Sequence, residues 1–204
     1  MAAERLSIFP LPGAILFPGL QLPLHIFEPR YRALVSDALV RDRRIAMIQP
    51  QGGAEGAPLF GIGCVGRIDE VEALDDGRYN IVLDGEARFR LLREIEVSTP
   101  YRQVEGELLR DPDDEVLSSA ERAGFEREAR RFASAQGYSV DWESVERLDD
   151  ALLINGVSQI APFDAAAKQA LLEASDLRTR CELLVQLMQF FGRSDPDESR
   201  VTLQ

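Results

Sequence analysis

The sequence has very few of the residues on which most catalytic and metal sites depend. Among its 204 residues there are one histidine, His25, one lysine, Lys168, and two cysteines, Cys64 and Cys181. A single histidine excludes metal sites built on a histidine pair, and two distant cysteines without CxxC spacing indicate neither a zinc site nor a disulfide framework. We therefore expect reduced, buried thiols, no bound metal and no cofactor.

The single lysine limits the enzyme classes further. A P-loop needs Gly-Lys-Ser/Thr to hold phosphates, and a Ser-Lys peptidase needs a lysine beside a nucleophilic serine. Lys168 instead follows three alanines in AAAKQALLEA, a stretch typical of an amphipathic helix. The sequence thus predicts a protein that is not an enzyme, with neither a Walker P-loop nor a Ser-Lys dyad.

Uninterrupted apolar runs are also missing. The longest apolar stretch, Leu6 to Phe27, contains four prolines, and each proline fixes φ and removes a backbone donor, which is incompatible with a continuous membrane helix. The N-terminus lacks the basic residues and small-residue cleavage site of a secretory signal. We expect a cytoplasmic protein without a membrane partner.

Acidic residues outnumber basic ones by 35 to 23, for a net charge of -12. Such a surface repels nucleic-acid phosphate, so an RNA-binding protein of this composition would need a local basic stripe. Four arginines among the predicted strands could form one: Arg78, Arg88, Arg90 and Arg93. Acidic residues interleave with them, which favours cross-strand ion pairs and leaves RNA binding as an alternative only.

The periodicity of apolar residues changes near position 110. Before it, short β-type runs alternate with turns such as Asp75-Asp76-Gly77, and one helix starts at Pro29. After it, helical stripes are predicted over 117–136, 142–160, 164–174 and 177–191. The sequence therefore predicts an α+β protein with a β-rich subdomain at 1–110, a helical bundle at 111–193 and a flexible tail at 194–204.

A GxGxxG string, Gly61-Ile62-Gly63-Cys64-Val65-Gly66, matches the dinucleotide fingerprint only formally. That fingerprint follows a strand and opens a helix, whereas here the β pattern continues to Val71. We expect Gly63 and Gly66 to let a strand bend or another backbone approach closely.

Four segments together resemble the Lon protease N-terminal domain family. The most distinctive is LSIFPLPGAILFPGLQLPLHIFEPRYR at 6–32, which is similar to the family's FPLPxxxLFPGxxLPLxIFEPRYR opening. PLFGIGCVGRI at 58–68, the hairpin and RFRL run within 76–91, and FD with KQALLE at 163–173 extend the likeness. The resemblance covers about residues 6 to 192.

The resemblance implies a PUA-like β pseudobarrel with one inserted helix, followed by a C-terminal α-helical bundle. In the full-length protease this domain precedes an ATPase module and a Ser-Lys peptidase module, and neither is expected here. It implies a non-catalytic polypeptide-binding module, adaptor-like, whose partners are unfolded or extended polypeptide and a protease or chaperone machine. The alternatives are an RNA-binding PUA-like module and a small-ligand site in the cleft between barrel and bundle.

The apolar segment after the first strand supplies the candidate peptide-contacting residues. Exposed apolar side chains in a proline-rigid loop would bind hydrophobic segments at a small ordering cost. The candidates are Leu11, Ile15, Leu16, Phe17, Leu20, Leu22 and His25. The competing interpretation places these apolar residues in the core and His25 in ordinary packing. A homodimer through the 11–22 loop or the 177–191 stripe stays open.

Four residues that follow this segment, Glu28, Pro29, Arg30 and Tyr31, are predicted to be structural. Pro29 suits the first turn of a helix, where its missing N–H does no harm. We expect Glu28, Arg30 and Tyr31 to hold the loop to that helix through an ion pair and packing.

Overall fold

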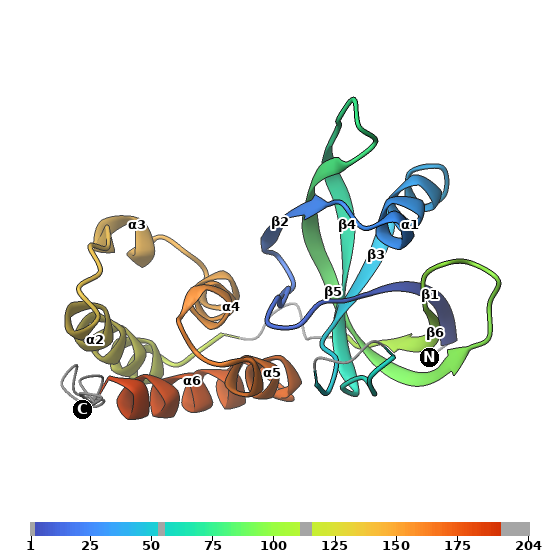
Figure 1. The fold of residues 1–204 in the computed structure, drawn as a ribbon. Helices are drawn as coiled ribbons and strands as arrows, with labels where there is room; N and C mark the ends of the chain where they lie inside the picture. The colour runs from blue at the N-terminus through green and yellow to red at the C-terminus, as the bar shows by residue number, and fades with distance from the viewer. Residues whose placement is uncertain (1–2, 53–55, 111–115, 193–204) are drawn as a thin grey trace, which may run out of the picture. The chain divides into compact units, whose positions relative to one another are not determined.

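The computed structural model describes residues 3–52, 56–110 and 116–192 (Figure 1). Contacts within the chain divide it into two compact units. The first comprises Met1–Pro112 and Asp164–Glu173, and the second comprises Asp113–Phe163 and Ala174–Gln204. The first holds the described strands, and the α+β class predicted from the sequence is confirmed. The predicted tail at 194–204 lies outside the described residues.

The first unit is built on a six-stranded sheet in the order β2-β5-β4-β3-β1-β6, in which β5 also pairs with β6. Its strands are β1 (Ala3–Pro10), β2 (Gln21–Ile26), β3 (Arg44–Ile48), β4 (Ile62–Ala73), β5 (Tyr79–Ile95) and β6 (Gln103–Leu108). Only the β1–β3 pair is parallel among these pairings. The additional β5–β6 pairing closes five strands into a ring, and β2 pairs with β5 outside that ring.

The turn predicted at Asp75-Asp76-Gly77 joins β4 to β5. The Leu74 and Arg78 backbones close it with an N–H···O bond of 2.9 Å, and Gly77 has φ +79°, a conformation that favours glycine. The resulting hairpin extends beyond the rest of the sheet (Figure 1). It carries the outer ends of β4 and β5 that form the candidate site.

One helix, α1 (Pro29–Leu39), packs on this sheet. It buries Tyr31, Leu34, Val35 and Ala38, which follow the i, i+3, i+4 spacing of a helix face. Their cluster includes Phe9 of β1 and further residues of the strands. A second cluster gathers around Phe89 of β5, so the unit has an apolar core on both sides of the strands.

Helix α5 (Ala165–Glu173) belongs to the first unit, although the sequence grouped 164–174 with the bundle. The buried Gln49 side chain donates to the Ala165 carbonyl and to Gln169 Oε1, each at 3.1 Å. Gln169 donates to the Ile62 carbonyl at 3.1 Å, and Arg88 donates to the Leu172 carbonyl at 2.8 Å. Long polar side chains thus tie α5 to the strands.

The second unit contains α2 (Ser119–Ala135), α3 (Trp142–Glu146), α4 (Asp150–Ile160) and α6 (Leu177–Phe191). The prediction of a single helix over 142–160 is wrong, because the segment forms two helices, α3 and α4, separated by a short turn. Asp149 caps α4 by accepting the Leu152 N–H at 2.7 Å, so a local side chain starts a new helix there. Phe125, Leu153 and Leu184 are among the buried residues that fill the unit.

Candidate functional site

The outer ends of β2, β5 and β4 present a solvent-facing surface whose side chains lie in two rows. The strand register places Pro23 opposite Val82 and Val82 opposite Glu70. The second row places His25 opposite Asn80 and Asn80 opposite Glu72. Because side chains alternate between the faces of a strand, these six point away from the core that buries Ile26, Ile81 and Leu83.

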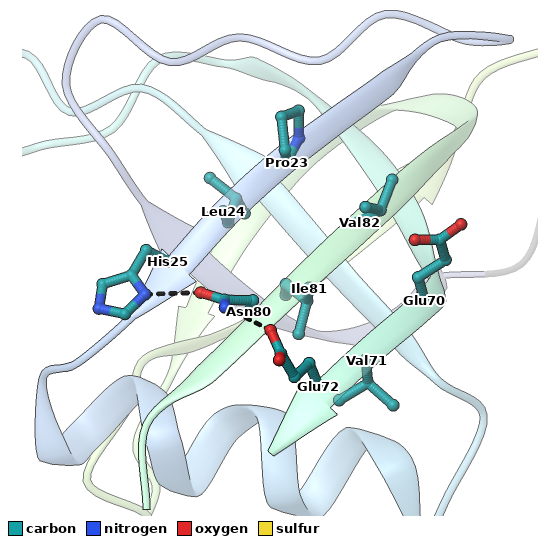
Figure 2. Close-up of a pocket in the computed structure, with 9 residues that line it drawn as sticks. All are labelled: Pro23, Leu24, His25, Glu70, Val71, Glu72, Asn80, Ile81 and Val82. Carbon is teal, nitrogen blue, oxygen red and sulfur yellow. Dashed lines mark hydrogen bonds between the residues drawn. The ribbon is translucent and has the colours of Figure 1, made fainter. Parts of the chain in front are cut away.

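A chain of hydrogen bonds runs along the second row (Figure 2). His25 Nδ1 lies 2.7 Å from Asn80 Oδ1, and Asn80 Nδ2 donates to Glu72 Oε2 at 2.6 Å. Arg78 Nη1 lies 3.3 Å from His25 Nε2. A guanidinium only donates, so the contact with Arg78 makes Nε2 the acceptor and leaves Nδ1 to donate to Asn80 Oδ1. The polar groups of the site therefore orient one another.

These rows border an open hollow of about 480 Å³ on the sheet. It is lined by Pro23, Leu24, His25, Glu70, Val71, Glu72, Asn80, Ile81 and Val82. The lining combines apolar walls with two carboxylates and contains no serine, cysteine or lysine that could act as a nucleophile. This arrangement can hold apolar and basic groups against the surface, but it offers no constellation for covalent chemistry.

The structure separates the predicted peptide-contacting residues into two groups. Ile15, Leu16 and Phe17 are buried, with at most 5% of their surface exposed, so they are not available to a ligand at the surface. Their burial favours the core interpretation, because Leu16 packs in the cluster beneath α1. Four candidates keep accessible surface: Leu11, Leu20 and Leu22 are half-buried, and His25 is exposed.

The predicted structural residues lie at the start of α1. Pro29 is the first helical residue, and Arg30 Nη2 lies 2.9 Å from Glu28 Oε2. The Arg30 guanidinium also sits 4.7 Å from the centre of the Tyr31 ring, and that buried ring lies 4.1 Å from the Phe9 ring. The ion pair and the ring contacts fix the segment between β2 and α1.

Gly63 and Gly66 both lie in β4, where neighbouring atoms leave no room for a side chain. A Cβ at Gly66 would come within 2.7 Å of Leu16 Cδ2, and one at Gly63 within 2.5 Å of Phe89. Close packing against other segments therefore accounts for both glycines.

The arginines that could have formed a basic stripe already have partners. Arg88 is buried against the Leu172 carbonyl. The other three face carboxylates, with distances of 2.6 Å for Arg78–Asp76, 3.1 Å for Arg90–Glu107 and 2.5 Å for Arg93–Glu105. A phosphate would have to displace these carboxylates, so the arrangement disfavours RNA binding. The small-ligand cleft between barrel and bundle stays a prediction.

Of the residues that line this hollow, sequence reasoning singled out only His25, and it missed Asn80 and Glu72 among others, as well as the neighbouring Phe27. Phe27 is 60% exposed, and its ring lies 6.2 Å from that of His25 in a stacked orientation. The period-two pattern of QLPLHIF does indicate that Pro23, His25 and Phe27 share one face. No local pattern connects them to Asn80 or Glu72, because that contact depends on how β2 pairs with β5.

The second unit has an apolar hollow of its own, of about 570 Å³. It is bounded by α2, α4 and the segment that contains α3, and its wall includes Phe125, Phe132, Trp142, Leu153 and Ile160. Among residues 3–52, 56–110 and 116–192, no helix is long and apolar enough to cross a membrane. Within the same ranges, no three His, Cys, Asp or Glu side chains gather where they could hold a metal ion.

Comparison with known proteins identifies the family of this chain. The sequence profile of the ATP-dependent protease La (LON) substrate-binding domain matches residues 5–189. The chain belongs to this family. This Lon-type substrate-binding domain is similar to the curated Lon protease 2 of Myxococcus xanthus, with 28% identity over 195 residues, 91% of this chain and 23% of that protein. It thus spans about a quarter of the length of such relatives.

Two solved structures share the fold of this Lon-type domain. The Lon N-terminal domain protein from Xanthomonas campestris superposes with a TM-score of 0.69 at 22% identity, covering 90% of this chain and 98% of that one. The N-terminal domain of Mycobacterium avium complex Lon protease gives 0.66 at 18% identity, covering 91% and 98%. The resemblance stated from the sequence motifs is confirmed.

Proposed function

We propose that this chain is a non-catalytic, adaptor-like module that binds unfolded or extended polypeptide for a protease or chaperone machine. The observation that carries the proposal is the match of a substrate-binding family over residues 5–189. We also propose that the closed ring of strands is the PUA-like pseudobarrel expected for that family.

The surface over β2, β5 and β4 supports polypeptide as the ligand. Its hollow is open to solvent, with apolar residues from all three strands and the carboxylates of Glu70 and Glu72 on the β4 side. The exposed Phe27 ring extends it at the end of β2. A polypeptide can offer both apolar and basic side chains to such a surface. The apolar side chains of a protein are accessible for this contact mainly when that protein is unfolded.

The proposal that this chain is non-catalytic rests on residue types. The sequence holds one histidine and one lysine, and Lys168 lies on α5 without a P-loop before it. The histidine in the surface hollow is bonded to an amide and a guanidinium rather than to a nucleophile. We therefore expect neither ATP nor peptide hydrolysis by this chain.

The test is binding of the purified chain to a permanently unfolded protein, such as a reduced and carboxymethylated one, compared with its native form. Binding of the unfolded form alone, measured by fluorescence anisotropy, is the expected result. Phe27→Asp should weaken this binding at least about fivefold, because it places a charge in an apolar contact.

Val40→Asp is the matched control. Val40 is a large apolar residue that is 81% exposed, follows the last residue of α1 and is not among the residues that line the hollow. Its substitution should leave binding unchanged. If the unfolded protein is not bound at all, or if the native form is bound equally well, the proposed function is wrong.

A further inference from the structure

Strand β2 is an edge. Among the described residues its only strand partner is β5, whereas the other five strands close into a ring. An edge strand presents backbone N–H and C=O groups that another extended chain can pair with. Which backbone groups are available depends on which residues of β2 direct their N–H and C=O groups toward β5 and which direct them to the open side.

The hydrogen-bond parity of the β2–β5 pair follows from one bond and the register. The Gly85 N–H donates to the Leu20 carbonyl at 2.8 Å. In an antiparallel ladder, mutually bonded pairs alternate with unbonded ones, so Leu22 and Leu24 bond their partners Leu83 and Ile81. The backbone groups of Pro23 and His25 therefore point to the open side.

The proline fits this assignment. A proline has no N–H, so it is tolerated in a sheet only where the missing donor faces away from the neighbouring strand. Position 23 is such a place in β2. The open edge consequently offers the Pro23 carbonyl together with both the N–H and the carbonyl of His25.

The side chains beside this edge alternate in chemistry. Leu22 and Leu24 are half-buried and pack against the core cluster on the inner face. On the outer face, Pro23 and His25 of β2 begin the two rows that continue across β5 to Glu70 and Glu72 of β4. Phe27 lies exposed just after β2. A strand added here would lie beside Leu22 and Leu24 on one face and beside Pro23 and His25 on the other, whereas Glu70 and Glu72 of β4 lie beyond β5.

We propose that the open edge of β2 takes up an extended segment of the bound polypeptide as a seventh strand, and that this segment alternates apolar with basic residues. The inference rests on the proposed function and specifies its site and substrate class. Backbone pairing is independent of sequence, which suits a module for many unfolded chains. The apolar residues would cover Leu22 and Leu24 on one face, and the basic ones would lie beside Pro23 and His25 on the other, attracted by the net charge of -12 of the chain.

The charge of the protein favours this occupant over a second copy of the chain. Each copy carries a net charge of -12, so pairing two β2 edges would bring two strongly acidic molecules together. Like charges brought together at such an interface oppose association. A basic segment is instead attracted to the surface.

The probe is a dye-labelled, end-capped ten-residue peptide of alternating valine and arginine. Pro23→Ala supplies the missing outward N–H, so it should tighten binding about two- to tenfold, the range of one added hydrogen bond. His25→Pro removes an outward N–H and should weaken binding by a similar factor. His25→Ala keeps the N–H and is the control for loss of the imidazole, and thermal unfolding checks that each variant is folded.

Peptides with N-methylated backbones test the pairing without altering the protein. Methylation of alternate residues blocks the amides on one edge of an extended peptide only. We expect one methylated set to lose binding at least tenfold and the other set to keep it. A version with glutamate in place of arginine should bind more weakly.

The outcomes separate the two proposals. Equal binding of both methylated sets, together with no change in Pro23→Ala, overturns the edge-pairing inference. If unfolded protein is still bound in that case, the proposed function stands and uses another surface. If Pro23→Ala instead forms dimers in sedimentation without peptide, the edge pairs with a second copy and the inference is also overturned.

Discussion

Gly63 shows how tightly a single position of the sheet is packed. It is buried in β4 next to Met47 of β3, and a Cβ there would clash with the Met47 carbonyl oxygen and lie 2.5 Å from Cε1 of Phe89. Neither a backbone carbonyl paired in a sheet nor a fully buried ring can move aside without disturbing the strands around it. The lack of a side chain is therefore required by packing and not by backbone conformation.

We predict that Gly63→Ala lowers the free energy of unfolding by about 1–3 kcal/mol, the usual cost of an overpacked core. Gly61→Ala is the matched control, because Gly61 is exposed and has no atom within 4 Å of an added Cβ. Urea denaturation followed by circular dichroism measures both. Equal midpoints for the two variants would contradict the packing argument.

Among the helices, α6 begins with a strongly stabilised carboxylate. The Asp176 side chain accepts from the Ser175 hydroxyl at 2.5 Å and from the Thr179 N–H at 2.7 Å. These hydrogen bonds lower the pKa of Asp176 from 3.8 to about 2. The helix N-terminus is where such a cap is expected, since its first N–H groups have no partner within the helix.

The lowered pKa of Asp176 determines how its contribution to stability changes with pH. A carboxyl whose pKa is lower in the folded state stabilises that state above its unfolded pKa, and the contribution is lost as the pH falls toward the folded pKa. Asp176→Asn removes this titration but keeps a capping oxygen. We expect the stability advantage of the natural protein over Asp176→Asn to be present at pH 6 and to shrink between pH 4 and pH 2.

Urea midpoints of both proteins across this pH range measure the effect. Asp75→Asn, in the exposed turn between β4 and β5, is the control for simple loss of one negative charge. If the difference between the natural protein and Asp176→Asn does not depend on pH, the cap does not act through its charge.

For the molecule as a whole, the two cysteines report on the two units. Cys64 lies in β4 between β3 and β5, and Cys181 lies on α6, and both are buried. Burial raises the pKa of the Cys181 thiol to about 11. Neither thiol should react with iodoacetamide at pH 8 in the folded protein, because the thiolate is the reactive form and access is blocked.

We predict that Cys181 becomes reactive at a lower urea concentration than Cys64. Helical contacts are mostly local, whereas Cys64 sits within a closed ring of strands that must open before it is exposed. Mass spectrometry of labelled peptides distinguishes the two sites. Reaction of both at the same urea concentration would show that the two units unfold as one.

Local patterns in the sequence were sufficient to predict much of the fold. The alternation of apolar residues before position 110 and the helical spacing after it predicted the α+β class, and the motif at 6–32 predicted the family. These inferences succeed because side-chain periodicity and turn chemistry are properties of neighbouring residues. The break between α3 and α4 was missed, since Asp149 interrupts an apolar stripe that continues across it.

Only the tertiary structure decided which residues reach the surface. It buries Ile15 to Phe17, attaches α5 to the sheet through Gln49 and Gln169, and leaves β2 as an edge that pairs only with β5 among the described strands. Each of these outcomes depends on contacts between segments far apart in the chain, which no local pattern specifies. The sequence alone determined what kind of domain this is, and the pairing of β2 with β5 determined where it presents an open edge.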